Sequence, residues 1–305
     1  TGVQTCALPI SLADLAGGTL AIGSVRIRRP VVHAVRHAEG RWNLAGLARR
    51  PDTPSTVPVT IEEGTLLVDD LRLQSRTTLR RVQLECAPAA DGRAVVRGSV
   101  EGDLFQRASL QGSLSPGGGA FDLSGAVEGA DVSPRLLQLV AAEVDPLSAS
   151  SATALRRWGG GIRGRVDLGF RAVGNLDDLP ATRATVAARV ESGRFEHASL
   201  PFPLRDVSAA LVANRAGIRC ERFEALTGSS IVRGSGSIAG WTPAADVDAV
   251  VEAERLVVDR HLEGLLPEAW RVQWSRLQPA GEIDLRAQVT RRAGGLRSEE
   301  HTSEL

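Results

Sequence analysis

The sequence predicts a mainly β protein, made of short antiparallel strands joined by tight turns, with few helices. The first observation is strict alternation of apolar and polar residues, because alternation gives a strand one apolar and one polar face. The second is composition: 43% hydrophobic residues and 32 Gly fit a folded β protein better than a disordered chain. The clearest alternating segments are 121–127, 165–173, 184–192, 246–253 and 282–290. The expected turns are at 89–92, 115–119, 191–194 and 214–217.

Both ends of the chain read as translated sequencing adapter. The tail RSEEHTSEL, residues 297–305, back-translates as AGA TCG GAA GAG CAC ACG TCT GAA CTC. The reverse complement of this DNA encodes VQTCALPI, which is residues 3–10. Because chance seldom produces such an inverted match, we expect residues 1–10 and 297–305 to be artefacts. The natural part is then expected to be residues 11–296, a piece of a longer protein.

The amino-terminal part predicts a strand followed by a turn. The strand RIRRPVVHAV covers residues 26–35, and the turn EGRWNLAGL covers residues 39–47 and ends in a short apolar, helix-like run. Gly40 is expected to reverse the chain, Trp42 to cap an apolar edge, and Asn43 to satisfy local backbone groups.

Two segments carry helical patterns. Residues 133–144 have Ser133 as a helix cap and Pro134 at the first helical position, followed by an apolar stripe. Residues 260–270 form a second candidate, interrupted by Pro267. Because amphipathic helices usually cover a core, both are expected to lie over an end or edge of the sheet.

Charge and motifs exclude several function classes. The 36 basic and 36 acidic residues balance, and no basic stripe with interleaved aromatics is present, so nucleic acid is not an expected partner. His33 and His37 have the spacing of a helical zinc pair but lie in a strand pattern without a third ligand. Residues 159–164, GGGIRG, lead into a strand and not into the helix that a dinucleotide site requires. The sequence predicts no catalytic residue, no metal and no cofactor, and therefore no enzyme.

Residues 18–47 resemble the AsmA-like family of bacterial envelope proteins, which includes TamB and YhdP. Members have a strand near the amino end, a Pro-containing strand and a turn of the form D/E-G-R-W-N-L. The matching residues here are Pro30, Glu39, Gly40, Arg41, Trp42, Asn43 and Leu44. Residues 192–238 and 266–289 are similar to later parts of the same family.

The resemblance implies a fold and a function. The expected fold is an elongated, curved antiparallel sheet forming an open apolar groove, in the periplasmic portion of a protein anchored in the inner membrane upstream of this piece. The implied function is to conduct phospholipid between the inner and outer membranes. Some members are linked instead to outer-membrane protein assembly, which would add an assembly partner.

The predicted groove lining consists of the apolar residues of four alternating strands. They are Val166, Leu168, Phe170, Val186, Ala188, Val190, Val247, Ala249, Val251, Ile283, Leu285 and Val289. The residues alone do not separate such a groove from a closed β-sandwich, in which the same side chains pack against another layer. A non-enzymatic assembly scaffold and a solenoid binding domain are the remaining alternatives.

The predicted organisation follows these features along the chain. The segments are 1–10, adapter; 11–56, the amino-terminal strand-turn-helix element; 57–132, a groove segment; 133–160, a helical insertion; 161–296, a second groove segment with a short helix near 260–270; and 297–305, adapter.

Overall fold

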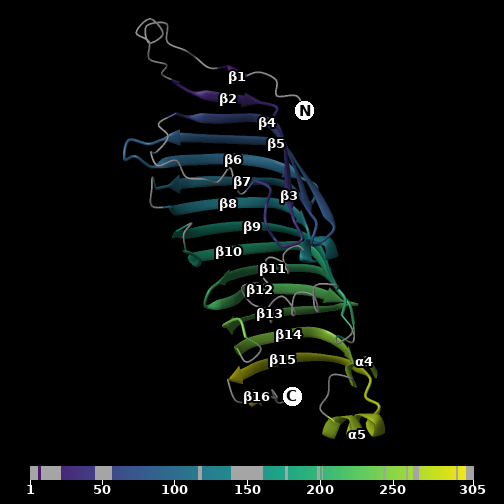
Figure 1. Cartoon of the computed structure of the whole chain (residues 1–305). Coiled ribbons are helices and arrows are strands. Elements are labelled where there is room, and N and C mark those ends of the chain that lie inside the picture. Colours follow the sequence, from purple (N-terminus) through teal and green to yellow (C-terminus); the bar gives the residue numbers. More distant parts are fainter. Residues whose placement is uncertain are drawn as a thin grey trace, which may run out of the picture. The chain divides into compact units, whose positions relative to one another are not determined.

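The computed structural model describes residues 6–7, 22–44, 57–115, 119–138, 161–175, 178–197, 200, 202–242, 245–258, 260–263, 268–292 and 295–299. Within them the chain is mainly β, with few helical residues (Figure 1). The strands pair in the order β1-β2-β4 and then consecutively to β16, while β3 also pairs with β4. This order leaves two free edges, so the sheet is open and does not close into a barrel. The predicted fold class, a mainly β antiparallel open sheet with a few short helices, is confirmed.

The chain divides into two compact units. Unit 1 comprises Thr1–Ala130 with Gly169–Ala184, and unit 2 comprises Asp131–Leu168 with Thr185–Leu305. The strands that begin in unit 1 are β1 Cys6–Ala7, β2 Val25–Arg28, β3 Val31–Arg36, β4 Val59–Asp70, β5 Ser75–Pro88, β6 Ala94–Gly102, β7 Phe105–Leu114, β8 Ala120–Asp131 and β10 Asp178–Phe195. Those that begin in unit 2 are β9 Ile162–Asn175, β11 Leu204–Asn214, β12 Gly217–Thr227, β13 Ser230–Ala239, β14 Asp246–Val258, β15 Gly281–Arg292 and β16 Gly295–Glu299. Both β1 and β16 include residues of the segments that read as adapter.

The first edge of unit 1 departs from the expected antiparallel pairing. Both β2 and β3 pair with β4 in parallel, β2 along its first four residues and β3 along its last six. A parallel pair needs a long connection, and residues 37–58 separate β3 from β4 along the chain. The break between β2 and β3 falls at Arg29 and Pro30, beside Glu63 of β4, which has a φ of 53°. Because Pro lacks an N–H group, it interrupts the edge strand at the position where β4 bends.

β-Bulges recur at matching positions on neighbouring strands. In unit 1 they fall at Glu63 of β4 and Arg81 of β5, on either side of the Gly64 and Val82 pair. In unit 2 the bulges at Asp206 and Arg255 lie on one line across the sheet. Arg205, next to the first bulge, pairs with Leu226, and Leu226 pairs with Ile231. Ile231 in turn pairs with Glu254, next to the second bulge. A bulge bends its strand and increases its twist, so aligned bulges curve the sheet within each unit.

The bulges also correct one predicted turn. Residues 191–194 were expected to connect two strands, but they lie inside β10, which continues to Phe195. Ser192 has a φ of 51°, and the pairing with β11 shifts between Val190 and Gly193. The same small and polar residues that form turns also form bulges, because many tight turns and the bulge at Ser192 both use a residue with positive φ.

The buried side chains of unit 2 gather around its bulges. We call this set the capped end: Leu204, Val207, Ala225, Ala253, Leu256, Val258 and Leu262. Phe195, Leu200 and Phe202 pack against part of it, and Trp274 packs against the rest. The core of unit 2 is therefore at one end of its strands.

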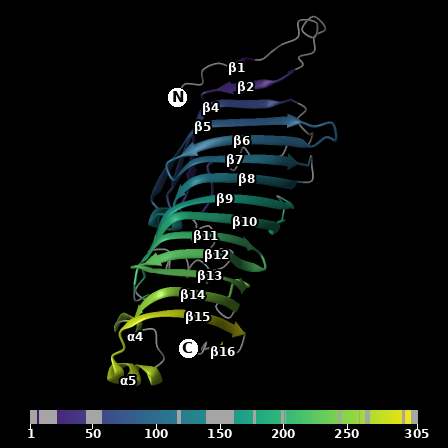
Figure 2. The ribbon, with the colours of Figure 1, turned by 180° about the vertical axis from the view of Figure 1, so that it is seen from behind.

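The helices partly match their predictions. Ser133 caps a helix over residues 134–138, where its Oγ accepts a hydrogen bond from the Leu136 N–H at 3.4 Å, while residues 139–160 lie outside the described residues. The second candidate is split into α4, Arg260–Glu263, and α5, Glu268–Leu277. The predicted end at residue 270 was too early, because α5 begins only after Pro267 and runs seven residues beyond Trp270. Figure 2 shows α4 and α5 beside the ends of β14 and β15.

Candidate functional site

Three apolar rows cross unit 2 from β10 to β15. Residues directly opposite each other in an antiparallel sheet share a face, so the pairing defines the rows. From β10 to β15 they are Val186, Ala213, Ile218, Ile238, Val247 and Arg291; then Ala188, Leu211, Cys220, Gly236, Ala249 and Val289; then Val190, Ala209, Phe223, Gly234, Val251 and Ala287. We call these eighteen residues the open face. All but Arg291 are apolar or glycine.

The open face is not buried. None of its residues falls in the buried class, and Ile238, Val251 and Val289 keep 37–41% of their surface exposed. Next to the open face, Leu285 opposite Ala253 and Ile283 opposite Leu256 are also more than 40% exposed. Isolated exposed apolar residues are common, but a continuous set across six strands indicates a surface that binds something apolar.

The opposite face of these strands is charged. Glu224, Arg233, Glu252 and Arg286 follow one another across β12 to β15 as directly paired neighbours. Arg233 forms ion pairs with Glu224 and Glu254, and Arg286 forms one with Glu252. The acidic neighbours raise the pKa of Arg233, so it remains charged. Unit 2 therefore has one solvated face and one apolar face.

The structure brings most of the predicted groove residues together. Val186, Ala188, Val190, Val247, Ala249, Val251 and Val289 are in the open face, and Ile283 and Leu285 continue it toward the capped end.

The predicted residues of β9 differ from this pattern. Val166 is 8% exposed and is therefore packed, which does not fit an open lining position. Leu168 is half-buried. Phe170, in unit 1, lies against Gly125 of β8, since a Cβ added at Gly125 would be 2.7 Å from the ring. An aromatic ring over a glycine stabilises neighbouring strands, so Phe170 has a structural role.

Sequence reasoning missed the contributions of β11 to β13. Leu211, Ile218, Cys220, Phe223 and Ile238 belong to the open face, although none was predicted to do so. A bulge in β12 after Cys220 shifts the alternation by one residue, which hides the pattern in that strand. The detectable signal is an apolar spacing of three between Cys220 and Phe223 within an otherwise alternating segment.

Cys220 reports on the environment at the middle of the open face. It is half-buried, and burial raises the pKa of its thiol. A raised pKa lowers the thiolate fraction and therefore the reactivity of the thiol. Cys86 occupies an equivalent position in unit 1, opposite Val59 and Val96 on the apolar face of β4 to β6. Both cysteines are free.

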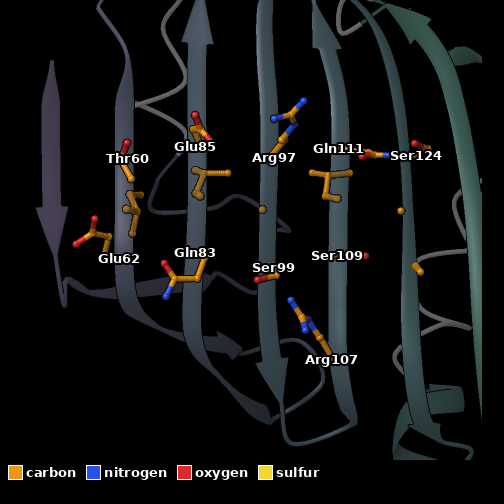
Figure 3. A pocket seen from close by; sticks show the side chains of 16 residues that line it. Thr60, Glu62, Gln83, Glu85, Arg97, Ser99, Arg107, Ser109, Gln111 and Ser124 are labelled. Carbon is orange, nitrogen blue, oxygen red and sulfur yellow. The ribbon is translucent and has the colours of Figure 1, made fainter. Parts of the chain in front are cut away.

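Unit 1 has a cavity of about 720 Å³ over β4 to β8. Ten of its sixteen lining residues are polar, among them Thr60, Glu85, Arg97, Gln111 and Ser124, which lie in one row across five strands (Figure 3). Exposed carboxylates, amides, hydroxyls and guanidinium groups do not exclude water. The lining also includes Ile61, Leu84 and Leu110, which form an apolar row across β4, β5 and β7, so the cavity is mixed in polarity.

The turn motif covers the outer edge of β3. The Asn43 side chain accepts a hydrogen bond from the Val35 N–H at 2.8 Å and donates one to the His33 carbonyl at 2.9 Å. Its amide thus takes the place of a neighbouring strand at this edge, next to the backbone bridge between Arg36 and Trp42. The guanidinium of Arg36 lies 5.6 Å from the centre of the Trp42 ring, and Arg36 also pairs with the buried Asp70. Leu44 is the last described residue of the motif, so the expected helical run lies outside the described residues.

His33 is engaged by a carboxylate and not by a metal-like cluster. Its Nε2 is 2.7 Å from Asp69 Oδ2, and Arg76 donates to the same carboxylate at 2.6 Å. Hydrogen bonds from Arg76 and His33 lower the pKa of Asp69 to about 2. Among the described residues, no group of three or more His, Cys, Asp or Glu side chains converges as metal ligands would.

Comparisons with known proteins found no matching family model, no similar curated protein and no similar solved structure. In the described part of the chain, no helix is both long enough and apolar enough to cross a membrane.

Proposed function

We propose that the chain is a piece of a non-enzymatic envelope protein that shields phospholipid acyl chains and conducts them between the inner and outer membranes. The observation that carries this proposal is the open face of unit 2, which is continuous across six strands and exposed. The resemblance of residues 18–47 to the AsmA-like family supports the same proposal, which includes a periplasmic location and an anchor in the inner membrane.

The pattern of burial favours an open surface over a closed sandwich. In a sandwich, the central residues of the inner face are the most buried, because a second sheet packs over them at about 10 Å. Here the buried residues are instead Leu256, Val258 and their neighbours at one end, while central residues such as Val251 stay exposed. A ligand that covers the open face would bury the apolar side chains that unit 2 itself leaves exposed.

Shielding an acyl chain requires no reactive group. Each methylene that leaves water contributes about 0.8 kcal/mol, and this contribution depends on area and not on direction. Gly234, Gly236, Ala249 and Ala287 keep the middle of the open face low, so a chain can lie close to the sheet. Because the contacts are non-directional, the lipid can move along the face without breaking specific bonds.

Native mass spectrometry with lipid extraction tests the proposal. The protein is purified from bacterial membranes in mild detergent, alongside the Leu285→Arg variant. We expect co-purified phospholipid in the parent chain and its loss in Leu285→Arg, because a buried guanidinium without a partner is costly. Circular dichroism checks that each variant remains folded, which is expected because Leu285 is 44% exposed.

Gln288→Arg is the matched control. Gln288 is on the same strand as Leu285 but on the polar face, opposite Val250. The substitution therefore adds the same charge without changing the open face. Equal lipid loss in both variants, or a folded parent chain without lipid, would contradict the proposal. The second result would favour an assembly scaffold.

A further inference from the structure

Helix α5 contacts the core of unit 2 through a single described side chain. Trp274 is half-buried and packs against the cluster of Ala253, Leu256, Val258 and Leu262. The other α5 side chains that the structure describes, at 270–273 and 275–277, are all exposed. In Figure 1, α5 lies outside the sheet, near the start of β15. Most of its surface is therefore available to a partner.

The exposed surface of α5 is rich in large apolar side chains. Trp270 is 58%, Val272 52% and Leu277 76% exposed. Trp270, Trp274 and Leu277 follow the i, i+4, i+7 spacing that places residues on one face of a helix. We call these three residues the α5 stripe. The middle of the stripe packs on unit 2, whereas both of its ends are in water.

The length of α5 makes this exposure costly. The helix has 10 residues. Isolated helices shorter than about 12–15 residues are marginal in water, and in proteins they depend on the burial of an apolar face. Within unit 2 only Trp274 provides such burial. A surface that covered Trp270 and Leu277 would therefore stabilise α5 as well as bind it.

The composition of α5 favours a lipid bilayer as that surface. Residues 269–281, AWRVQWSRLQPAG, contain two arginines and no acidic residue, so the segment is complementary in charge to an anionic membrane. Arg271 and Arg276 fall on opposite sides of the α5 stripe in a helix of about 3.6 residues per turn. Trp prefers the boundary between hydrocarbon and headgroups. Helices with Trp and Leu on one face and Arg beside them are typical of the bilayer interface.

The α5 stripe adjoins the open face. Ala253 and Leu256, in the cluster that Trp274 contacts, pair with Leu285 and Ile283. Leu285 and Ile283 are 44% and 41% exposed and lie on the same side of the sheet as that cluster. Apolar surface thus continues from the open face, through Leu285 and Ile283, to α5. A bilayer in contact with the α5 stripe would lie next to the open face.

We propose that α5 docks unit 2 on the surface of an anionic phospholipid bilayer, with Trp270 and Leu277 inserted among the lipids. This docking is separate from lipid binding by the open face. Its consequence, that acyl chains enter the open face at the capped end, rests on the proposed function.

Vesicle flotation tests the docking. The full chain is delipidated and mixed with vesicles of phosphatidylethanolamine that contain a smaller share of phosphatidylglycerol, and bound protein floats in a density gradient. We expect the parent chain to float and Leu277→Asp to bind about tenfold more weakly, because a carboxylate replaces an apolar side chain that would leave water.

Tryptophan fluorescence locates the contact. Lipids brominated along the acyl chain quench tryptophans that lie among them, so they should quench the parent chain. Trp270→Leu keeps an apolar side chain at this position and should still float, but the quenching should fall. Quenching that is unchanged in Trp270→Leu would contradict the insertion of Trp270.

Leu71→Asp is the matched control. Leu71 is an exposed leucine of unit 1, at 53%, and this variant should float like the parent chain. Equal binding of Leu277→Asp and Leu71→Asp would overturn the docking. A lipid-free dimer that dissociates in Leu277→Asp would assign the α5 stripe to a second copy of the chain and would also contradict it.

The docking and the proposed function can fail separately. A parent chain that does not float but co-purifies with phospholipid would overturn the docking and keep the proposed function. A parent chain that floats but carries no phospholipid would support the docking and contradict the proposed function.

Discussion

The capped end and the open face of unit 2 are built from the same strands but differ in burial. Leu256 is 5% exposed, whereas Leu285, one strand away on the same side of the sheet, is 44% exposed. Both belong to alternating segments of the same kind. The difference comes from what packs on them: Leu262, Phe202 and Trp274 contact the cluster around Leu256. Stability is therefore concentrated at the capped end, and binding capacity at the open face.

The largest expected effect separates these two regions directly. Leu256→Ala should lower the free energy of unfolding by about 2–4 kcal/mol, because it leaves a cavity in a packed cluster. Leu285→Ala should cost less than about 1 kcal/mol, since nearly half of that side chain is already in water. Urea unfolding followed by circular dichroism measures both values. Equal costs would mean that the open face is a closed core.

The bulge in β14 offers the next test. The Ser230 side chain is 1% exposed and its Oγ donates to the Arg255 carbonyl at 2.7 Å. Ser230→Ala leaves that carbonyl unsatisfied and should cost about 1–3 kcal/mol in unfolding free energy. Ser235→Ala, at an exposed position of the same strand, should have little effect in the same urea titration. A Ser230→Ala variant as stable as Ser235→Ala would show that the bulge does not support the capped end.

A smaller effect is expected at the turn motif of unit 1. Asn43→Ala removes two hydrogen bonds to β3 and should cost about 1 kcal/mol. The Val35 amide should then exchange with deuterium faster, which hydrogen exchange mass spectrometry detects. Asn43→Asp keeps the acceptor for Val35 and should retain its protection. If the Val35 amide exchanged at the same rate in Asn43→Ala, the turn motif would not protect the edge of β3.

The smallest expected effect is the loss of stability at low pH when Asp69 is protonated. The pKa of Asp69 is lowered to about 2 in the folded chain, below its ordinary value of about 3.9. The stability from its bonds to Arg76 and His33 is thus complete above about pH 4 and is lost as the pH falls through about 2. The difference in urea midpoint between the parent chain and Asp69→Asn should shrink from pH 5 to pH 2. A difference that stays constant over this range would contradict the assignment.

Alternation and turn residues were enough to predict the strand class, the antiparallel arrangement and part of the open face, whereas the openness of the sheet was implied only by the family resemblance. Val247, Ala249 and Val251 are examples, because period two alone assigns them to one side of β14. Bulges were not predicted. They reverse the phase of alternation after Cys220 and inside residues 191–194, and a single shifted residue is ambiguous without the neighbouring strand.

The packing of the capped end was also beyond sequence reasoning. Leu256, Leu262 and Trp274 lie on three elements, β14, α4 and α5, and alternation within a strand does not predict that these elements pack together. The parallel pairing of β2 and β3 with β4 was missed for a similar reason, since nothing in a short strand specifies the direction of its partner.

Photo-crosslinking shows which face of unit 2 contacts the acyl chain of a bound phospholipid. Phospholipid with a diazirine in its acyl chain is loaded onto the full chain and irradiated, and the adducts are mapped by mass spectrometry. The account predicts adducts at open-face residues such as Ile238, Val251 and Val289, and few on the charged face around Arg233 and Glu252. Adducts concentrated on the charged face, or spread equally over both faces, would contradict it.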